Sequence, residues 1–193
     1  VGAAGRRGVA SLHAVDLDRY GKLDTWTQCA ARLHNECLLS ADDAERIMLL
    51  DTFGAAIGNS DRHFGNITLF DRREGPFELA PAYDMLPMLF APQDGQIVPR
   101  TFEPPGPTAA TLAVWPRAIA LAVQYWMRLC DEPRLSSGFR VLAAQCLDML
   151  EGEVRPGEPM SRAHRMLWLS STKPIAALAI ASLWERGLLG LDD

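Results

Sequence analysis

Hydrophobic and polar residues follow a helical period over much of this chain. Between residues 44 and 57, apolar side chains return every three or four positions, and polar side chains occupy the opposite side. Ser40 stands before this run in the position of an N-cap, while Gly58 and Asn59 follow it as C-cap residues. The pattern predicts one amphipathic helix between these caps.

Two short apolar runs come next and indicate strands rather than helices. Residues 67–70 and 77–80 are separated by a turn at residues 72–76, which is the pattern of a β-hairpin. Prolines then recur from Pro81 to Pro107, and they exclude a continuous helix there. We expect an ordered but irregular loop in this segment.

Helical patterns cover most of what remains. Pro116 suits the first turn of a helix. Four further helices are expected, over Thr25 to Cys37, Arg117 to Cys130, Ser136 to Glu151, and Lys173 to Arg186. Residues 9–13 form only a short mixed apolar run, and the acidic residues at 16–18 indicate a turn. The predicted fold class is therefore mainly α with one small β-hairpin.

Length, charge and cysteine usage narrow the class of protein. The chain has 193 residues, enough for a single domain over 1–193, which we expect to be a fragment of a longer protein. Its net charge of -5 argues against direct nucleic-acid binding, and its apolar runs are too short to cross a membrane. Cysteines stand at four separated positions, Cys29, Cys37, Cys130 and Cys146. They predict buried, reduced thiols in a cytoplasmic protein.

The candidate chemistry lies in the loop after the central helix. Asp61 and Asn66 are five residues apart, and Asp84 follows the predicted hairpin. Protein kinases use this order: an Asp accepts the proton of the acceptor hydroxyl, an Asn five residues later binds metal, and a further Asp binds metal after a short hairpin. Carboxylate and amide oxygens are also the ligands that Mg²⁺ prefers. On spacing alone, however, Asp and Asn in a polar loop are more often turn residues.

The complete motif resembles a known family. The loop reads Gly-Asn-Ser-Asp-Arg-His-Phe-Gly-Asn over residues 58–66, and Leu-Ala-Pro-Ala-Tyr-Asp follows at residues 79–84. These two runs resemble the HipA family of bacterial kinases, which pairs a Gly-Asn-x-Asp-x-His-x-x-Asn loop with a Leu-x-Pro-x-Tyr-Asp motif. No position departs from either pattern, and the resemblance extends over most of the chain.

The resemblance implies a function and a set of site residues. It implies the C-terminal lobe of a kinase fold, acting as a Ser/Thr protein kinase with ATP and Mg²⁺. Asp61 matches the catalytic base, while Asn66 and Asp84 match the residues that bind metal and nucleotide. Family members are often toxins of toxin-antitoxin pairs with a DNA-binding antitoxin partner, and their protein substrates include aminoacyl-tRNA synthetases.

One family feature is missing from the chain. Kinases of this type place ATP under a small lobe that carries a Gly-rich loop and a phosphate-binding lysine. The lysines here are Lys22 and Lys173, and neither follows a strand in a suitable context. We expect this small lobe upstream of Val1, so that the fragment alone binds ATP poorly and transfers little phosphate.

Two alternative functions stay open at this stage. The first is a small-molecule kinase of related fold, similar to the antibiotic and choline kinases, which also use an Asp-x-x-x-x-Asn loop and a later Asp. The second is a binding module without catalysis, serving a DNA-binding partner. The Tyr-Asp motif argues against the former, and the intact Asp61, Asn66 and Asp84 argue against the latter.

Three further residues of the two motif runs have side chains that could act at the site. We expect His63 to brace the loop by hydrogen bonds, because no second His or Cys lies nearby at metal spacing. Arg62 could steady a phosphate, but a solvated loop arginine is equally expected, so it stays outside the catalytic set. Tyr83 is predicted to be a buried aromatic residue with a satisfied hydroxyl.

Overall fold

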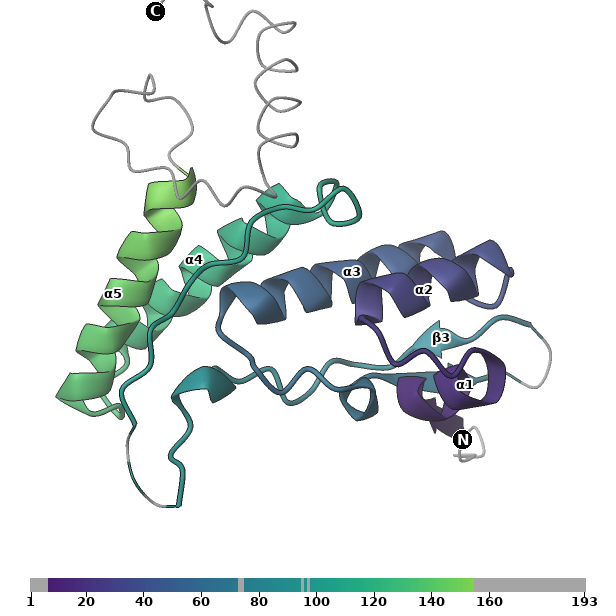
Figure 1. Ribbon diagram of the computed structural model, residues 1–193, viewed down its shortest axis with the longest axis horizontal. Coiled ribbons are helices and arrows are strands. Elements are labelled where there is room, and N and C mark those ends of the chain that lie inside the picture. Colours follow the sequence, from purple (N-terminus) through teal and green to yellow (C-terminus); the bar gives the residue numbers. More distant parts are fainter. Residues whose placement is uncertain (1–6, 73–74, 95, 97, 155–193) are drawn as a thin grey trace, which may run out of the picture.

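The computed structural model describes residues 7–72, 75–94, 96 and 98–154 (Figure 1). In chain order the regular elements are β1 (Gly8–Ser11), α1 (Leu12–Arg19), α2 (Trp26–Asn35), α3 (Ala41–Ala56), the short 3₁₀ helix η1 (Phe64–Asn66), β2 (Thr68–Asp71), β3 (Glu78–Leu79), the 3₁₀ helix η2 (Met88–Phe90), α4 (Trp115–Asp131) and α5 (Ser137–Val154). The described part is thus mainly helical, as predicted.

Helix α3 is the central element of the fold. It packs against α2 on one side and α4 on the other, and α5 packs against α4 (Figure 1). The predicted caps are present: the Ser40 hydroxyl accepts a hydrogen bond from the Asp43 amide at 3.1 Å. At the other end, the amide of Gly58 donates to Ala55 and that of Asn59 donates to Gly54, the paired bonds of a Schellman cap.

Gly58 lets the chain leave α3 abruptly. Its φ of +70° is in the left-handed region, where a residue with a Cβ is strained. The turn sends the chain directly into the loop that carries the candidate residues. The amide of Leu89, in η2, donates to the Gly58 carbonyl at 2.9 Å, so the segment after Asp84 returns to the same helix end.

The sheet contains one strand more than the predicted hairpin. Its order is β1-β2-β3 with antiparallel pairing throughout, so β2 is central. The register pairs Ser11 with Thr68, and Leu69 with Leu79. The run at residues 9–13 did not indicate a strand because β1 is only four residues long and its first two residues are exposed.

Helix α1 replaces the acidic turn that the sequence suggested. Asp16 is fully buried on this helix rather than exposed in a turn. Its carboxylate accepts hydrogen bonds from the amides of Lys22 and Leu23, both at 2.9 Å. These two backbone donors just beyond the helix are thereby paired. The local sequence does not distinguish an Asp that accepts hydrogen bonds from later backbone amides from an Asp that forms a turn, so the turn was predicted.

Two apolar clusters meet at α3. One fills the space between the sheet and helices α1 to α3, and it includes Trp26 and the loop residue Phe64. The other joins the C-terminal end of α3 to α4 and α5 around the fully buried Trp126. The first cluster includes Ala44 and Ile47 near the start of α3, and the second includes Ala56 at its end, so the helix is packed along its length.

The remaining predictions have mixed outcomes. The helices predicted after Pro116 correspond to α4 and α5, and among its described residues the proline-rich segment has η2 as its only helix and no strand. The helix predicted over residues 173–186 lies outside the described residues. All four cysteines are free, but only Cys29 and Cys146 are buried and Cys37 is exposed, so the prediction of four buried thiols was wrong. None of the described helices combines the length and apolar character needed to cross a membrane.

Arg32 joins the acidic groups at one end of the α1–α2 pair. Its guanidinium pairs with Asp24 through two nitrogens, at 2.7 and 2.9 Å, and contacts buried Asp16 at 3.2 Å. Hydrogen bonding from Arg32 lowers the pKa of Asp24 below its usual value of 3.8. A carboxyl whose pKa is lower in the folded protein contributes stability above its unfolded pKa, and this is lost as pH falls through the folded value.

We therefore predict that Asp24→Asn lowers the free energy of unfolding by about 1 kcal/mol at about pH 7, because it removes the two-bond ion pair. The deficit should shrink as pH falls below 3.8, where the native carboxyl also becomes protonated. Urea denaturation at about pH 7 and about pH 3 measures both values. Asp18→Asn, at an exposed position of α1, is the control. An equal deficit at both pH values would contradict the assignment.

Candidate active site

A buried carboxamide connects the two halves of the motif. Asn59 is 1% exposed, and its side-chain oxygen accepts the amide hydrogen of Asp61 at 3.0 Å. Its side-chain nitrogen donates to the carbonyl of Asp84 at 3.3 Å. One side chain therefore holds residues 61 and 84 beside each other, although the hairpin separates them in sequence.

Asn66 extends this network to the end of the loop. Its side chain is buried, at 6% residue exposure, and its amide nitrogen donates to the carbonyl of Asp61 at 2.9 Å. This hydrogen bond uses the nitrogen and leaves the carboxamide oxygen as the atom that can bind a cation. The structure thus brings together all three residues that the sequence singled out.

The two carboxylates face solvent rather than the core. The side chain of Asp61 is 50% exposed, and Asp84 is also exposed. Asp84 has a φ of +56°, in the left-handed region that Asp tolerates better than most residues. Open carboxylates next to a rigid loop can meet a large partner molecule as well as a small one.

The residues fit a magnesium ion held jointly with phosphate. The Asn66 oxygen and the Asp84 carboxylate are hard oxygen ligands on segments that Asn59 connects. Among the described residues, no three His, Cys, Asp or Glu side chains gather into a metal site. Mg²⁺ commonly takes one or two carboxylates and completes its shell with water and substrate phosphates. The arrangement therefore suits a metal that arrives with a nucleotide.

The structure also shows a contact that the sequence did not indicate. Arg62 donates from Nε to a carboxylate oxygen of Asp51 on α3 at 3.2 Å, and its Nη1 donates to the carbonyl of Asn59. Asp51 is further fixed by the amide and hydroxyl of Thr27, on α2. Neither the phosphate role nor the solvated role considered for Arg62 describes this arrangement, in which the side chain ties the loop to α3.

His63 braces the loop, as predicted. Its Nδ1 accepts the amide hydrogen of Gly65 at 3.1 Å, and its carbonyl accepts from the indole nitrogen of buried Trp26 at 3.0 Å. A Cβ at Gly65 would lie 2.9 Å from the imidazole ring, so a larger residue there would displace the ring. His63 Nε2 lies 4.0 Å from the carboxylate of Asp61.

The prediction for Tyr83 was half wrong. The residue is 44% exposed rather than buried, although its hydroxyl is satisfied. The hydroxyl donates to the Gly65 carbonyl at 2.7 Å and lies 2.9 Å from the Thr68 hydroxyl. The polar atoms that the hydroxyl reaches belong to the loop and to β2, so Tyr83 forms a second connection between the two halves of the motif.

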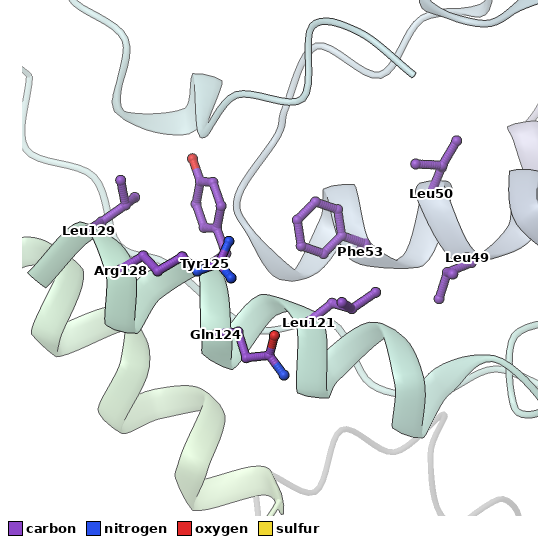
Figure 2. Close-up of a pocket in the computed structure, with 8 residues that line it drawn as sticks. All are labelled: Leu49, Leu50, Phe53, Leu121, Gln124, Tyr125, Arg128 and Leu129. Carbon is purple, nitrogen blue, oxygen red and sulfur yellow. The ribbon is translucent and has the colours of Figure 1, made fainter. Parts of the chain in front are cut away.

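A separate pocket lies between α3 and α4 (Figure 2). Its volume is about 480 Å³. The lining is mostly apolar and comprises Leu49, Leu50 and Phe53 of α3 and Leu121, Gln124, Tyr125, Arg128 and Leu129 of α4. None of Asp61, Asn66 or Asp84 lines it, so its chemistry is distinct from that of the loop.

Comparison with known proteins identifies relatives. A family described as the HipA-like C-terminal domain matches residues 7–133, which contain Asp61, Asn66 and Asp84. The toxin YjjJ of Escherichia coli (strain K12) is 34% identical over 145 residues, which make up 75% of this chain and 32% of that protein. The chain thus spans about a third of the length of this curated relative.

Tyr83→Phe tests the connection between the loop and the segment after the hairpin. Removing the hydroxyl should lower the free energy of unfolding by about 1 kcal/mol, because the Gly65 carbonyl loses its donor. Urea denaturation gives the value. Tyr125→Phe is the matched control, since no hydrogen bond of its hydroxyl is found within the described ranges, and we expect a change below about 0.5 kcal/mol. Equal losses in the two variants would contradict the connection.

Proposed function

The chain belongs to the HipA-like C-terminal domain family, and we propose that it is the catalytic lobe of a Ser/Thr protein kinase. The reaction would transfer the γ-phosphoryl group of ATP to a protein hydroxyl. One observation carries the proposal: Asn59 forms hydrogen bonds to the backbones of both Asp61 and Asp84, and Asn66 forms one to the Asp61 carbonyl. This arrangement would keep the proposed base close to the two residues proposed to bind metal.

In the proposed mechanism Asp61 orients the acceptor hydroxyl and accepts its proton as the oxygen attacks phosphorus. Its backbone is held on both sides, by Asn59 at the amide and by Asn66 at the carbonyl, so the carboxylate projects from a fixed position. The Asn66 oxygen and the Asp84 carboxylate would hold Mg²⁺. When bound, this ion offsets the negative charge of the phosphates.

The exposure of the carboxylates supports a protein as the acceptor. A serine or threonine on another protein must reach the base without the rest of that protein colliding with the fold. The Asp61 side chain is half-exposed, and Asp84 is exposed beside it. These positions give a macromolecular hydroxyl an open approach, which a kinase of small molecules does not require.

The rest of the proposal concerns a longer protein. We propose that a second lobe with a Gly-rich loop and a lysine completes the ATP site, because the chain covers 32% of the toxin YjjJ and the kinases that it resembles carry such a lobe. By analogy with the toxin YjjJ, we propose a toxin controlled by an antitoxin partner that binds DNA. An aminoacyl-tRNA synthetase is a candidate substrate, by the resemblance to HipA kinases.

The first test follows phosphate. The gene product that carries this chain should transfer label from radioactive ATP to protein in the presence of Mg²⁺. Asp61→Ala should lower the rate by at least about a hundredfold, because the hydroxyl loses its base. Asp18→Ala, on the exposed side of α1, should transfer at the native rate. Label that enters only small solutes would contradict a protein acceptor, and label on protein that survives Asp61→Ala would contradict the base.

The second test follows the metal. Asp84→Asn keeps the side-chain shape and tolerates the left-handed φ, while it removes the charge that Mg²⁺ prefers. We expect the affinity for Mg·ATP to fall at least about tenfold, whereas ATP without Mg²⁺ binds equally to both proteins. Isothermal titration calorimetry measures both affinities. An unchanged affinity for Mg·ATP would remove Asp84 from the metal site.

A further inference from the structure

We propose that Arg62 is a positioning residue that straps the candidate loop across helix α3, with Gly54 as the gap through which the strap passes. The strap comprises Arg62, its anchor Asp51 and the gap at Gly54. Its effect on catalysis rests on the kinase function proposed above. Its effect on the loop follows from the contacts alone.

Both ends of the strap are fixed. At one end the guanidinium Nε meets Asp51 Oδ1 at 3.2 Å, while Asp51 Oδ2 accepts from the Thr27 amide at 3.1 Å and hydroxyl at 2.8 Å. At the other end Nη1 donates to the Asn59 carbonyl. The side chains of Arg62 and Asp51 are 29% and 15% exposed, so water screens this ion pair less than an exposed one.

Gly54 supplies the space that the strap occupies. A Cβ at this position would lie 2.6 Å from Cδ of Arg62 and 3.3 Å from Cε of Met85. Glycine inside a helix lowers helix stability by about 1 kcal/mol relative to alanine. Helix α3 is otherwise well capped, so Gly54 is unfavourable for the helix itself and needs another explanation. Arg62 cannot simply turn aside, because its guanidinium is held by Asp51 and by Asn59 at once.

The strap acts through Asn59. The carbonyl of Asn59 receives Arg62, and the side chain of the same residue holds the Asp61 amide and the Asp84 carbonyl. A displaced Arg62 therefore changes the position of Asn59, and with it the spacing of the base and the metal-binding carboxylate. Misplacement of reacting groups by about 1 Å can lower a rate by about a hundredfold.

Gly54→Ala tests the strap while it leaves every polar group in place. In the gene product that carries the chain, kcat for phosphate transfer should fall about tenfold to a hundredfold, with KM for Mg·ATP changed by less than about threefold. The melting temperature should change little, because the helix propensity that alanine adds offsets the contacts that a displaced Arg62 loses. Gly138→Ala is the matched control, since a Cβ on this α5 residue has nothing within 4 Å. An unchanged kcat would overturn the proposal.

A second variant pair shows whether Gly54 acts through Arg62. Arg62→Met removes both anchors but keeps much of the side-chain volume, and it should lower kcat about as much as Gly54→Ala. Arg62→Lys, which keeps the charge for Asp51 but lacks the forked guanidinium, should restore part of the rate. The double variant Gly54→Ala, Arg62→Met should be no slower than Arg62→Met alone. Strictly additive losses would overturn the shared mechanism.

Hydrogen exchange gives a readout that does not depend on kinase activity. In Gly54→Ala the amides of residues 59–66 should exchange at least about tenfold faster than in the native protein, while amides of α5 exchange equally. Unchanged exchange in the loop would overturn the strap. A native protein that transfers no phosphate would instead refute the proposed function, and the exchange result would still decide the position of the loop.

Discussion

The site depends on a single buried carboxamide. Asn59 has almost no contact with water, so its oxygen and nitrogen must find partners inside the protein. They find them on segments separated by the hairpin, at the Asp61 amide and the Asp84 carbonyl. A buried polar group without its partner costs about 1 to 3 kcal/mol, so the two segments are held together by the cost of separating them.

Asn59 can hold the two segments together because it lies just beyond the end of α3, which fixes its position. The helix is packed by two apolar clusters and ends in a Schellman cap in which the Asn59 amide bonds back to Gly54. Arg62 returns to the same helix and meets Asp51. The loop is therefore attached to the most tightly packed element of the fold, although its own carboxylates are open to solvent.

The sequence predicted the elements whose signals are local. The Ser40 cap, the helical period of α3 and the hairpin could be recognised because neighbouring residues determine them. Strand β1 was not predicted, since it becomes a strand only by pairing with β2. Helix α1 was not predicted either, because the partners that allow Asp16 to be buried on it, Arg32 and the Lys22 amide, lie later in the chain. Partners far along the chain leave no periodic signal.

The same distinction applies within the site. The complete two-part motif, and not the spacing alone, led us to expect Asp61, Asn66 and Asp84 at one site. The strap was not foreseeable, because nothing in the order of residues couples Gly54 to Arg62 or Arg62 to Asp51. A glycine inside a helix pattern was the available signal, since such a glycine often marks a close approach by another group.

The network holds main-chain atoms of Asp61 and Asp84, not their carboxylates. Within this network folding therefore does not depend on the two carboxylates, although the φ of +56° at Asp84 favours Asp, Asn or Gly there. A descendant of this chain could lose both acids by mutation and still present the same loop to a partner. The atoms that hold the loop and the side chains that would carry the proposed chemistry are therefore different, so loss of the two acids need not disturb the architecture around them.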